Sequence, residues 1–165
     1  MSIQVGDKIP EAMLFHMVDG KIEKIGTDEL FNGKRVVLFA LPGAFTPTCS
    51  ALHLPGFLAR SAAFHSRGIE KLICLSVNDP YVMALWEDQQ NVAGRVTMIA
   101  DGNAEFTLAT GLEIDRSESG MGLRSQRYAM IVEDRIVKVL RVEEPGRFEV
   151  SDADSMLAFL NSELY

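Results

Sequence analysis

The segment 36–49 reads V-V-L-F-A-L-P-G-A-F-T-P-T-C and predicts a buried strand, a turn and the start of a helix. Its first six residues form an apolar, β-branched run that is typical of a strand inside a sheet. Pro42-Gly43 interrupts that run. Thr46-Pro47 then predicts a helix N-terminus, with Thr as the N-cap and Pro as the first helical residue. The segment therefore indicates an α/β fold in which a helix directly follows a buried strand.

Cys49, the third residue of this predicted helix, lies where a sulfur would be reactive. The N–H groups of a first helical turn have no partner within the helix, and the helix dipole places positive potential there, so both favour a thiolate. The hydroxyl of Thr46 is expected to reach the sulfur and the molecule that the sulfur attacks. Pro42 has no N–H and can cover the site without offering a competing donor. The alternative is a small core residue after a turn, because free Cys is often buried.

The spacing P-x-x-x-T-x-x-C at residues 42–49 resembles the active-site motif of the peroxiredoxins, and the filled form P-G-A-F-T-P-T-C-S resembles their type II, peroxiredoxin-5-like branch. Further motifs occur in the order of that family: G-D-K-I-P at 6–10, L-P-G-F at 54–57, S-V-N-D at 76–79, Trp86, and R-Y-A-M at 127–130. Because the matches span about residues 3–163, the resemblance covers nearly the whole chain.

The resemblance implies a thiol peroxidase that needs no metal, flavin or haem. The thiolate of Cys49 would attack hydrogen peroxide or an organic hydroperoxide and become a sulfenic acid, releasing water or an alcohol. Thr46, Arg127 and the N–H of Cys49 would bind the peroxide. An outside thiol would then reduce the sulfenic acid, with glutathione and glutaredoxin favoured and thioredoxin as the alternative. The resemblance also implies a homodimer in which Phe45, an aromatic side chain beside the site, packs near the partner.

Two arginines compete for the role of the active-site Arg. Arg127 matches the family motif, and its forked guanidinium could stabilise the thiolate and hold the peroxide. Without that match, a surface Arg at a strand end would be the plainer interpretation. Arg124, three residues earlier, is expected to pair with a carboxylate behind the site.

Cys74 lies in an apolar run and is predicted to be a core thiol. The alternative is a resolving partner for Cys49, which would require Cα atoms within about 7 Å and local unwinding of the helix. In the family that the chain resembles, some type II members carry a Cys at this 25-residue spacing. Members that resolve internally as two-Cys enzymes use a Cys near the C-terminus, and residues 151–165 contain none. This departure points to an external thiol.

Other chemistries fit the sequence less well. His53 follows Cys49 by one helical turn, which is the spacing of a Cys–His nucleophile or a metal pair, but a zinc site needs three or four ligands and the sequence has no further Cys/His cluster near them. A thiol–disulfide oxidoreductase would carry C-x-x-C, and position 46 is Thr. A non-peroxidatic thioredoxin-fold redox or partner-binding module is the remaining alternative.

Composition narrows the partners and the location. The formal net charge is −7 without a basic cluster, so neither nucleic acid nor an anionic membrane is an expected partner. No apolar run approaches the roughly 18 residues that span a bilayer. The first residues resemble no secretory signal. We therefore expect a cytoplasmic protein.

Periodicity and turn residues predict one thioredoxin-like domain over 1–165, an α/β sandwich whose mixed central sheet has helices on both faces. The predicted strands are 35–41, 69–77, 96–100, 128–132 and 136–142. The predicted helices are 48–67 with a kink at Pro55, 80–90, 103–110, and 151–160. Residues 115–122 are expected to be a polar loop. Glu133-Asp134-Arg135 predicts a hairpin turn, in which Arg135 replaces the family's usual Gly and should change the geometry.

Overall fold

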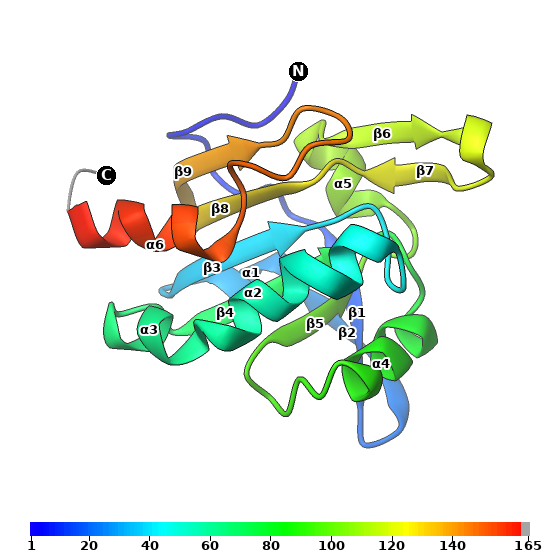
Figure 1. The fold of residues 1–165 in the computed structure, drawn as a ribbon, viewed down its shortest axis with the longest axis horizontal. Helices are drawn as coiled ribbons and strands as arrows, with labels where there is room; N and C mark the ends of the chain where they lie inside the picture. Colours follow the sequence, from blue (N-terminus) through cyan, green and yellow to red (C-terminus); the bar gives the residue numbers. More distant parts are fainter. Residues whose placement is uncertain (163–165) are drawn as a thin grey trace.

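The computed structural model describes residues 1–162, and its centre is a seven-stranded mixed sheet in the order β2-β1-β5-β4-β3-β8-β9 (Figure 1). The strands are β1 (Met13–Val18), β2 (Lys21–Gly26), β3 (Arg35–Ala40), β4 (Lys71–Ser76), β5 (Thr97–Ala100), β8 (Tyr128–Glu133) and β9 (Ile136–Val142). Strands β3, β4 and β5 run parallel, and the other pairs are antiparallel. The mixed sheet of the predicted thioredoxin-like sandwich is thereby confirmed.

Helices cover both faces of this sheet, as predicted (Figure 1). They are α1 (Thr27–Phe31), α2 (Leu54–Ala59), α3 (Ser61–Ser66), α4 (Pro80–Gln89), α5 (Glu105–Thr110) and α6 (Ala153–Ser162). Alternation along β3 sends Val37 and Phe39 into one core with α2, α3, α4 and α6, and Val36 and Leu38 into the other with α1 and α5. Cys49 belongs to the first core.

The predicted helix 48–67 is divided into three segments. It begins at Pro47 and passes through a π-helical turn, η1 (Cys49–His53), before it continues as α2. The N–H of Leu54 donates to the carbonyl of Cys49, five residues back, and Pro55 follows without an N–H of its own. A second interruption at Arg60 (φ −106°, ψ 8°) separates α2 from α3. The predicted kink at Pro55 therefore takes the form of a π-turn directly before that residue.

Several elements were not predicted. The β1–β2 hairpin and α1 precede the first predicted strand. The prediction of a polar loop at 115–122 is wrong at both ends, because β6 (Glu113–Arg116) and β7 (Gly122–Ser125) form a two-stranded sheet around the short turn η2 (Ser117–Ser119). Most residues of this ribbon are only half-buried, and the fully buried one is the polar Ser125, so its sequence lacks the apolar alternation that marks a strand.

The β8–β9 hairpin turn keeps a regular geometry despite Arg135. Asp134 (φ 44°) and Arg135 (φ 73°) both lie in the left-handed region, as a two-residue type I′ turn requires. The expected change of geometry is therefore wrong. The left-handed conformation costs a non-glycine residue about 1 kcal/mol. In this conformation Arg135 forms an ion pair with Asp28 (2.7 Å).

Candidate active site

Cys49 lies at the carboxyl end of β3, in the first turn of the helix that follows. The carbonyl of Thr46 accepts a hydrogen bond from the N–H of Ser50 (3.0 Å), so the helix starts where predicted. The hydroxyl of Thr46, however, donates to the carbonyl of Gly43 (2.7 Å) rather than capping the helix. Thr46 therefore stabilises the turn before the helix. The thiol of Cys49 is free and fully buried.

Arg127, directly before β8, is the arginine that contacts the sulfur. Its Nη2 donates to Sγ of Cys49 at 3.1 Å. A guanidinium at this distance favours negative charge on sulfur, and its remaining N–H groups offer donors to an oxygen that approaches the same sulfur.

His53 holds the guanidinium of Arg127 from the other side. Its Nδ1 accepts from Nη1 of Arg127 (2.9 Å), and its Nε2 donates to the carbonyl of Ser151 (3.1 Å). Burial, and then the charge of Arg127, lower the pKa of His53 to about 3, and the hydrogen bond to Ser151 opposes this shift only in part. The ring is therefore neutral with its proton on Nε2. Both ring nitrogens are engaged, so His53 positions Arg127 rather than pairing with sulfur or a metal.

Phe148, which was not predicted from the sequence, completes the enclosure of this arginine. The guanidinium carbon of Arg127 lies 5.7 Å from the centroid of the Phe148 ring, within the range of a cation–π contact. The same ring lies 5.0 Å from the ring of His53. Phe148 and Ser151 come from the loop between β9 and α6, far from Cys49 in sequence, and no local motif marks either of them.

Arg124, on β7, supports the loop before the helix. Its Nη1 donates to the carbonyl of Pro42 (3.2 Å) and its Nε to the carbonyl of Met121 (2.9 Å). The predicted pairing with a carboxylate is wrong, because in the described part of the chain the guanidinium contacts backbone carbonyls instead. A Cβ at Gly43 would lie 2.7 Å from Nη1 of Arg124, which explains the glycine after Pro42.

The S-V-N-D motif and Trp86 hold the same loop from the side of β4. Oδ1 of Asn78 accepts from the N–H of Ala44 (2.9 Å) and from the hydroxyl of Ser76 (2.5 Å). The indole N–H of Trp86 donates to the hydroxyl of Ser50 (3.0 Å), the neighbour of the reactive cysteine. These motif residues therefore hold the backbone of Ala44 in the turn and the side chain of Ser50 at the helix start.

Cys74 lies on β4, opposite Phe39 of β3, and is fully buried. Burial, together with the nearby Cys49, raises the pKa of the Cys74 thiol well above its ordinary value, and Arg127 opposes this only weakly. A neutral, enclosed thiol is a poor nucleophile. The geometry favours a core thiol over a resolving partner.

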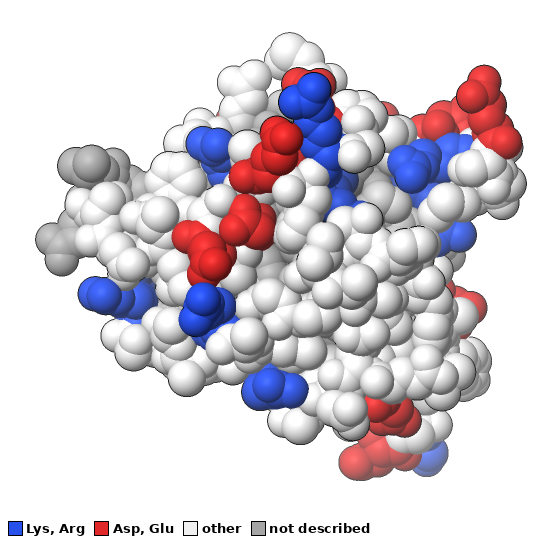
Figure 2. All heavy atoms as spheres, in the orientation of Figure 1, with Lys and Arg blue, Asp and Glu red and all other residues white. Residues whose placement is uncertain are grey.

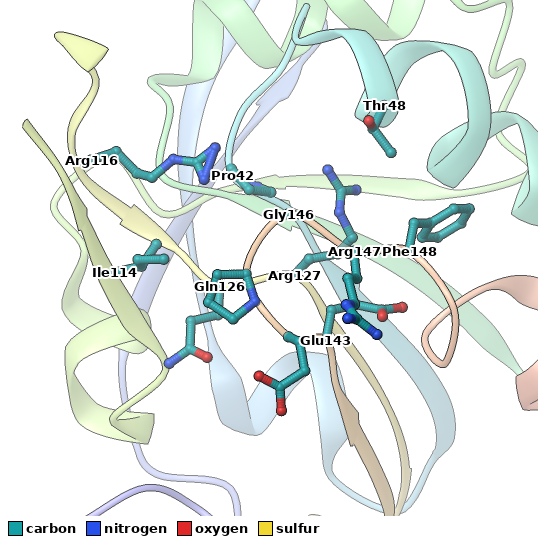
Figure 3. A pocket seen from close by; sticks show the side chains of 12 residues that line it. Pro42, Thr48, Ile114, Arg116, Gln126, Arg127, Glu143, Gly146, Arg147 and Phe148 are labelled. Carbon is teal, nitrogen blue, oxygen red and sulfur yellow. The ribbon is translucent and has the colours of Figure 1, made fainter. Parts of the chain in front are cut away.

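A pocket of about 130 Å³ opens beside the site, between β6 and the loop after β9 (Figure 3). Its wall includes Pro42, Thr48, Arg116, Arg127 and Phe148. Figure 3 shows the guanidinium of Arg127 reaching toward the helix that carries Thr48. The pocket therefore combines apolar rings with cationic donors next to the arginine that contacts sulfur.

Within residues 1–162, no group of three or more His, Cys, Asp and Glu side chains could hold a metal ion. None of the helices in this range is long and apolar enough to span a bilayer.

Comparisons with known proteins agree on one family. Residues 4–157 match the redoxin family. The chain is 45% identical over 164 residues to rice peroxiredoxin-2E-2, chloroplastic, covering 96% of this chain and 73% of the relative. It is 40% identical to the hybrid peroxiredoxin hyPrx5 of Haemophilus influenzae, covering 97% of this chain and 67% of the relative. Among solved structures, reduced Prx3 of Vibrio vulnificus in complex with hydrogen peroxide is 46% identical, with a TM-score of 0.92 over 96% of this chain and 99% of that chain.

Proposed function

Since this chain belongs to the redoxin family and to the type II peroxiredoxins, which are thiol-dependent peroxidases, we propose that Cys49 is its peroxide-reducing residue and that an external thiol completes the cycle. The observation that carries this proposal is the contact between Nη2 of Arg127 and Sγ of Cys49 (3.1 Å). The complex of the Vibrio protein with hydrogen peroxide supports a peroxide substrate.

The proposed reaction begins with a nucleophilic attack by the Cys49 thiolate on one peroxide oxygen. An S–O bond forms while the O–O bond breaks, and the departing oxygen takes up a proton and leaves as water or an alcohol. Arg127 and the N–H of Cys49, which has no helical partner in the first turn, stabilise the charge that moves from sulfur to the departing oxygen. Thr46 is proposed as a further peroxide-binding group and Pro42 as the cover of the site.

The pocket beside Arg127 suits the organic part of a hydroperoxide or of an incoming thiol. Its wall offers Pro42 and Phe148 for apolar contact, and Arg116 for a negatively charged group. We therefore propose that organic hydroperoxides are substrates as well as hydrogen peroxide.

Reduction of the sulfenic acid is assigned to outside thiols, because Cys74 is buried and neutral. The first thiol forms a mixed disulfide with Cys49 and releases water, and a second thiol then releases the Cys49 thiolate and leaves as the oxidised partner. Glutathione with glutaredoxin is the proposed reductant, and thioredoxin is the alternative. We place the enzyme in the cytoplasm, where these systems keep thiols reduced.

Turnover with each reductant in separate assays tests this proposal. We expect steady peroxide consumption with glutathione and glutaredoxin, and slower consumption with thioredoxin and its reductase. Peroxide loss is followed directly, and a reaction without protein serves as the control. If the reduced protein fails to consume even one equivalent of peroxide in a single turnover, the chain is a partner-binding module on this fold.

A homodimer is also proposed, through an exposed apolar surface next to the site. This surface comprises Phe45, Leu52, Tyr81 and Leu85, which are 44–65% exposed. Figure 2 shows a broad area without charged side chains over α4 and the start of the helix that carries Cys49. Phe45 also lies 6.5 Å from Trp86, ring to ring, so it packs partly on its own chain. An uncharged surface of this kind is typical of a protein interface.

Sedimentation of the reduced protein at several concentrations is expected to give a dimer in the micromolar range. Tyr81→Glu should shift the protein toward monomer, because it places a charge within the apolar surface. Leu108→Glu is the matched control, since Leu108 is similarly exposed (51%) but lies on α5, against the opposite face of the sheet. A wild-type monomer that persists into the high micromolar range would remove the dimer and leave the chemistry at Cys49 unaffected.

A further inference from the structure

Glu143, directly after β9, is a buried carboxylate with an unusual number of donors around it. Its side chain accepts hydrogen bonds of 2.7–2.9 Å from one hydroxyl and three consecutive backbone N–H groups, those of Glu149, Val150 and Ser151, whose hydroxyl is the fourth donor. The residue is only 6% exposed. A buried charge is costly unless it is fully hydrogen-bonded, so this carboxylate holds the 144–151 loop in one conformation.

The same residue is connected to the active site at two points. Its backbone N–H donates to the carbonyl of Arg127 (2.9 Å). Its carboxylate fixes Ser151, whose carbonyl accepts from His53, and His53 in turn accepts from the guanidinium of Arg127. A closed circuit of hydrogen bonds thus leads from the backbone of Arg127 through Glu143 and back to the side chain of Arg127.

The 144–151 loop also carries Phe148, which lies against the guanidinium of Arg127 and the ring of His53. The contact of Arg127 with His53, which is held by Ser151, and its contact with Phe148 therefore both depend on the conformation of this loop. The hydrogen-bond donors to the carboxylate of Glu143 all lie in this loop, so Glu143 acts on the guanidinium of Arg127 through the loop.

We propose that Glu143 is a positioning residue for peroxide reduction: its carboxylate folds the 144–151 loop so that Ser151 and Phe148 hold His53 and Arg127 against the sulfur of Cys49. This inference rests on the proposed chemistry at Cys49. Although burial raises the pKa of Glu143, the four donors outweigh it and leave the pKa below its ordinary value. The carboxylate is consequently charged at neutral pH, and the loop is held throughout that range.

Glu143→Gln tests the proposal, because Gln keeps the size of the side chain but removes its charge and one acceptor oxygen. The fluorescence of Trp86, the single Trp of the chain, reports oxidation of the neighbouring helix start in stopped flow. We expect the second-order rate constant with hydrogen peroxide to fall about tenfold, since small displacements of a positioning group have effects of this order or larger. Glu118→Gln, the same change at an exposed position, should leave the rate unchanged.

A readout independent of peroxide separates this proposal from the proposed function. In the wild-type protein the Nε2 proton of His53 should exchange slowly in NMR spectra, because it is buried and bonded to Ser151. In Glu143→Gln we expect faster exchange of this proton together with the slower oxidation. A folded Gln variant with the wild-type rate, or with slower oxidation but an unchanged His53 proton, would overturn the positioning role.

Should Glu143→Gln fail to fold, Glu143→Asp provides the same comparison, because it retains the charge and shortens the reach by one methylene. Loss of His53 protection and of oxidation rate together is again the expected result. Wild-type values of both in the Asp variant would overturn the proposal.

Discussion

Replacement of Cys49 by Ser is expected to abolish peroxide reduction with every reductant. A hydroxyl in this position is not ionised by the contact with Arg127 and cannot accept oxygen as a sulfenic acid does. Rates of peroxide consumption should fall to those of the reductant mixture alone. Mass spectrometry of the wild-type protein after one equivalent of peroxide should show the added oxygen, or the mixed disulfide formed from it, on the peptide containing Cys49.

Cys74→Ser is the matched control, since it makes the same atomic change at the other cysteine. Because Cys74 is buried and neutral, we expect this variant to keep most of the activity with glutathione and glutaredoxin. The hydroxyl will cost some stability, because the position lies within an apolar core. A correctly folded Cys74→Ser protein without turnover would show that Cys74 takes part in resolution.

Arg127→Ala is the second large effect that we expect. It removes the donor to sulfur, and it leaves Nδ1 of His53 without its partner in a buried place. Loss of a single preorganised donor to a developing charge commonly costs about 10²–10³ in rate, and Arg127 serves both the thiolate and the departing oxygen. The second-order rate constant of oxidation, measured by stopped flow, should fall within this range. Arg127→Lys should recover little, because one ammonium cannot reproduce the forked contact with sulfur and ring nitrogen together.

Arg124→Ala provides the comparison within the same site. Its guanidinium contacts the carbonyls of Pro42 and Met121, so its removal loosens the loop without taking a donor from the sulfur. We expect a smaller loss of rate than for Arg127→Ala, at comparable circular dichroism spectra. The reverse order of the two variants would transfer the catalytic assignment to Arg124.

Local patterns predicted the parts of the site that are continuous in sequence. The strand, the turn and the helix start at 36–49 followed from an apolar run, a Pro-Gly interruption and Thr46-Pro47, and the structure contains all three. The choice of Arg127 over Arg124 came from a motif, because nothing in the local sequence distinguishes two arginines near a strand end. Arg124 lies on β7, a strand that the sequence did not predict, and donates to the carbonyl of Pro42. Arg127 lies directly before β8 and contacts the sulfur.

Contacts between segments that are distant in the sequence could not be predicted from local patterns. The sequence suggests His53 only as a partner of sulfur or metal, because its spacing from Cys49 indicates which helix face the two share but not which residue lies opposite that face. The residue opposite Nε2 of His53 is Ser151, which lies in the loop after β9. No sequence pattern pointed to Glu143 either, since a Glu at a strand end is ordinarily solvated and only the structure shows that this one is buried.

The π-turn has a consequence for the comparison of related chains. A turn that closes from Leu54 to Cys49 contains one residue more than an α-helical turn over the same span. A related chain that lacks a single residue here could keep all of α2 in place, and an alignment would show only a one-residue gap. Because an α-helical turn covers the same span with one residue fewer, the residue at the position of Cys49 could also keep its orientation toward the arginine at the position of Arg127. A gap of one residue in this segment should therefore not be treated as loss of the active site where every motif residue is present.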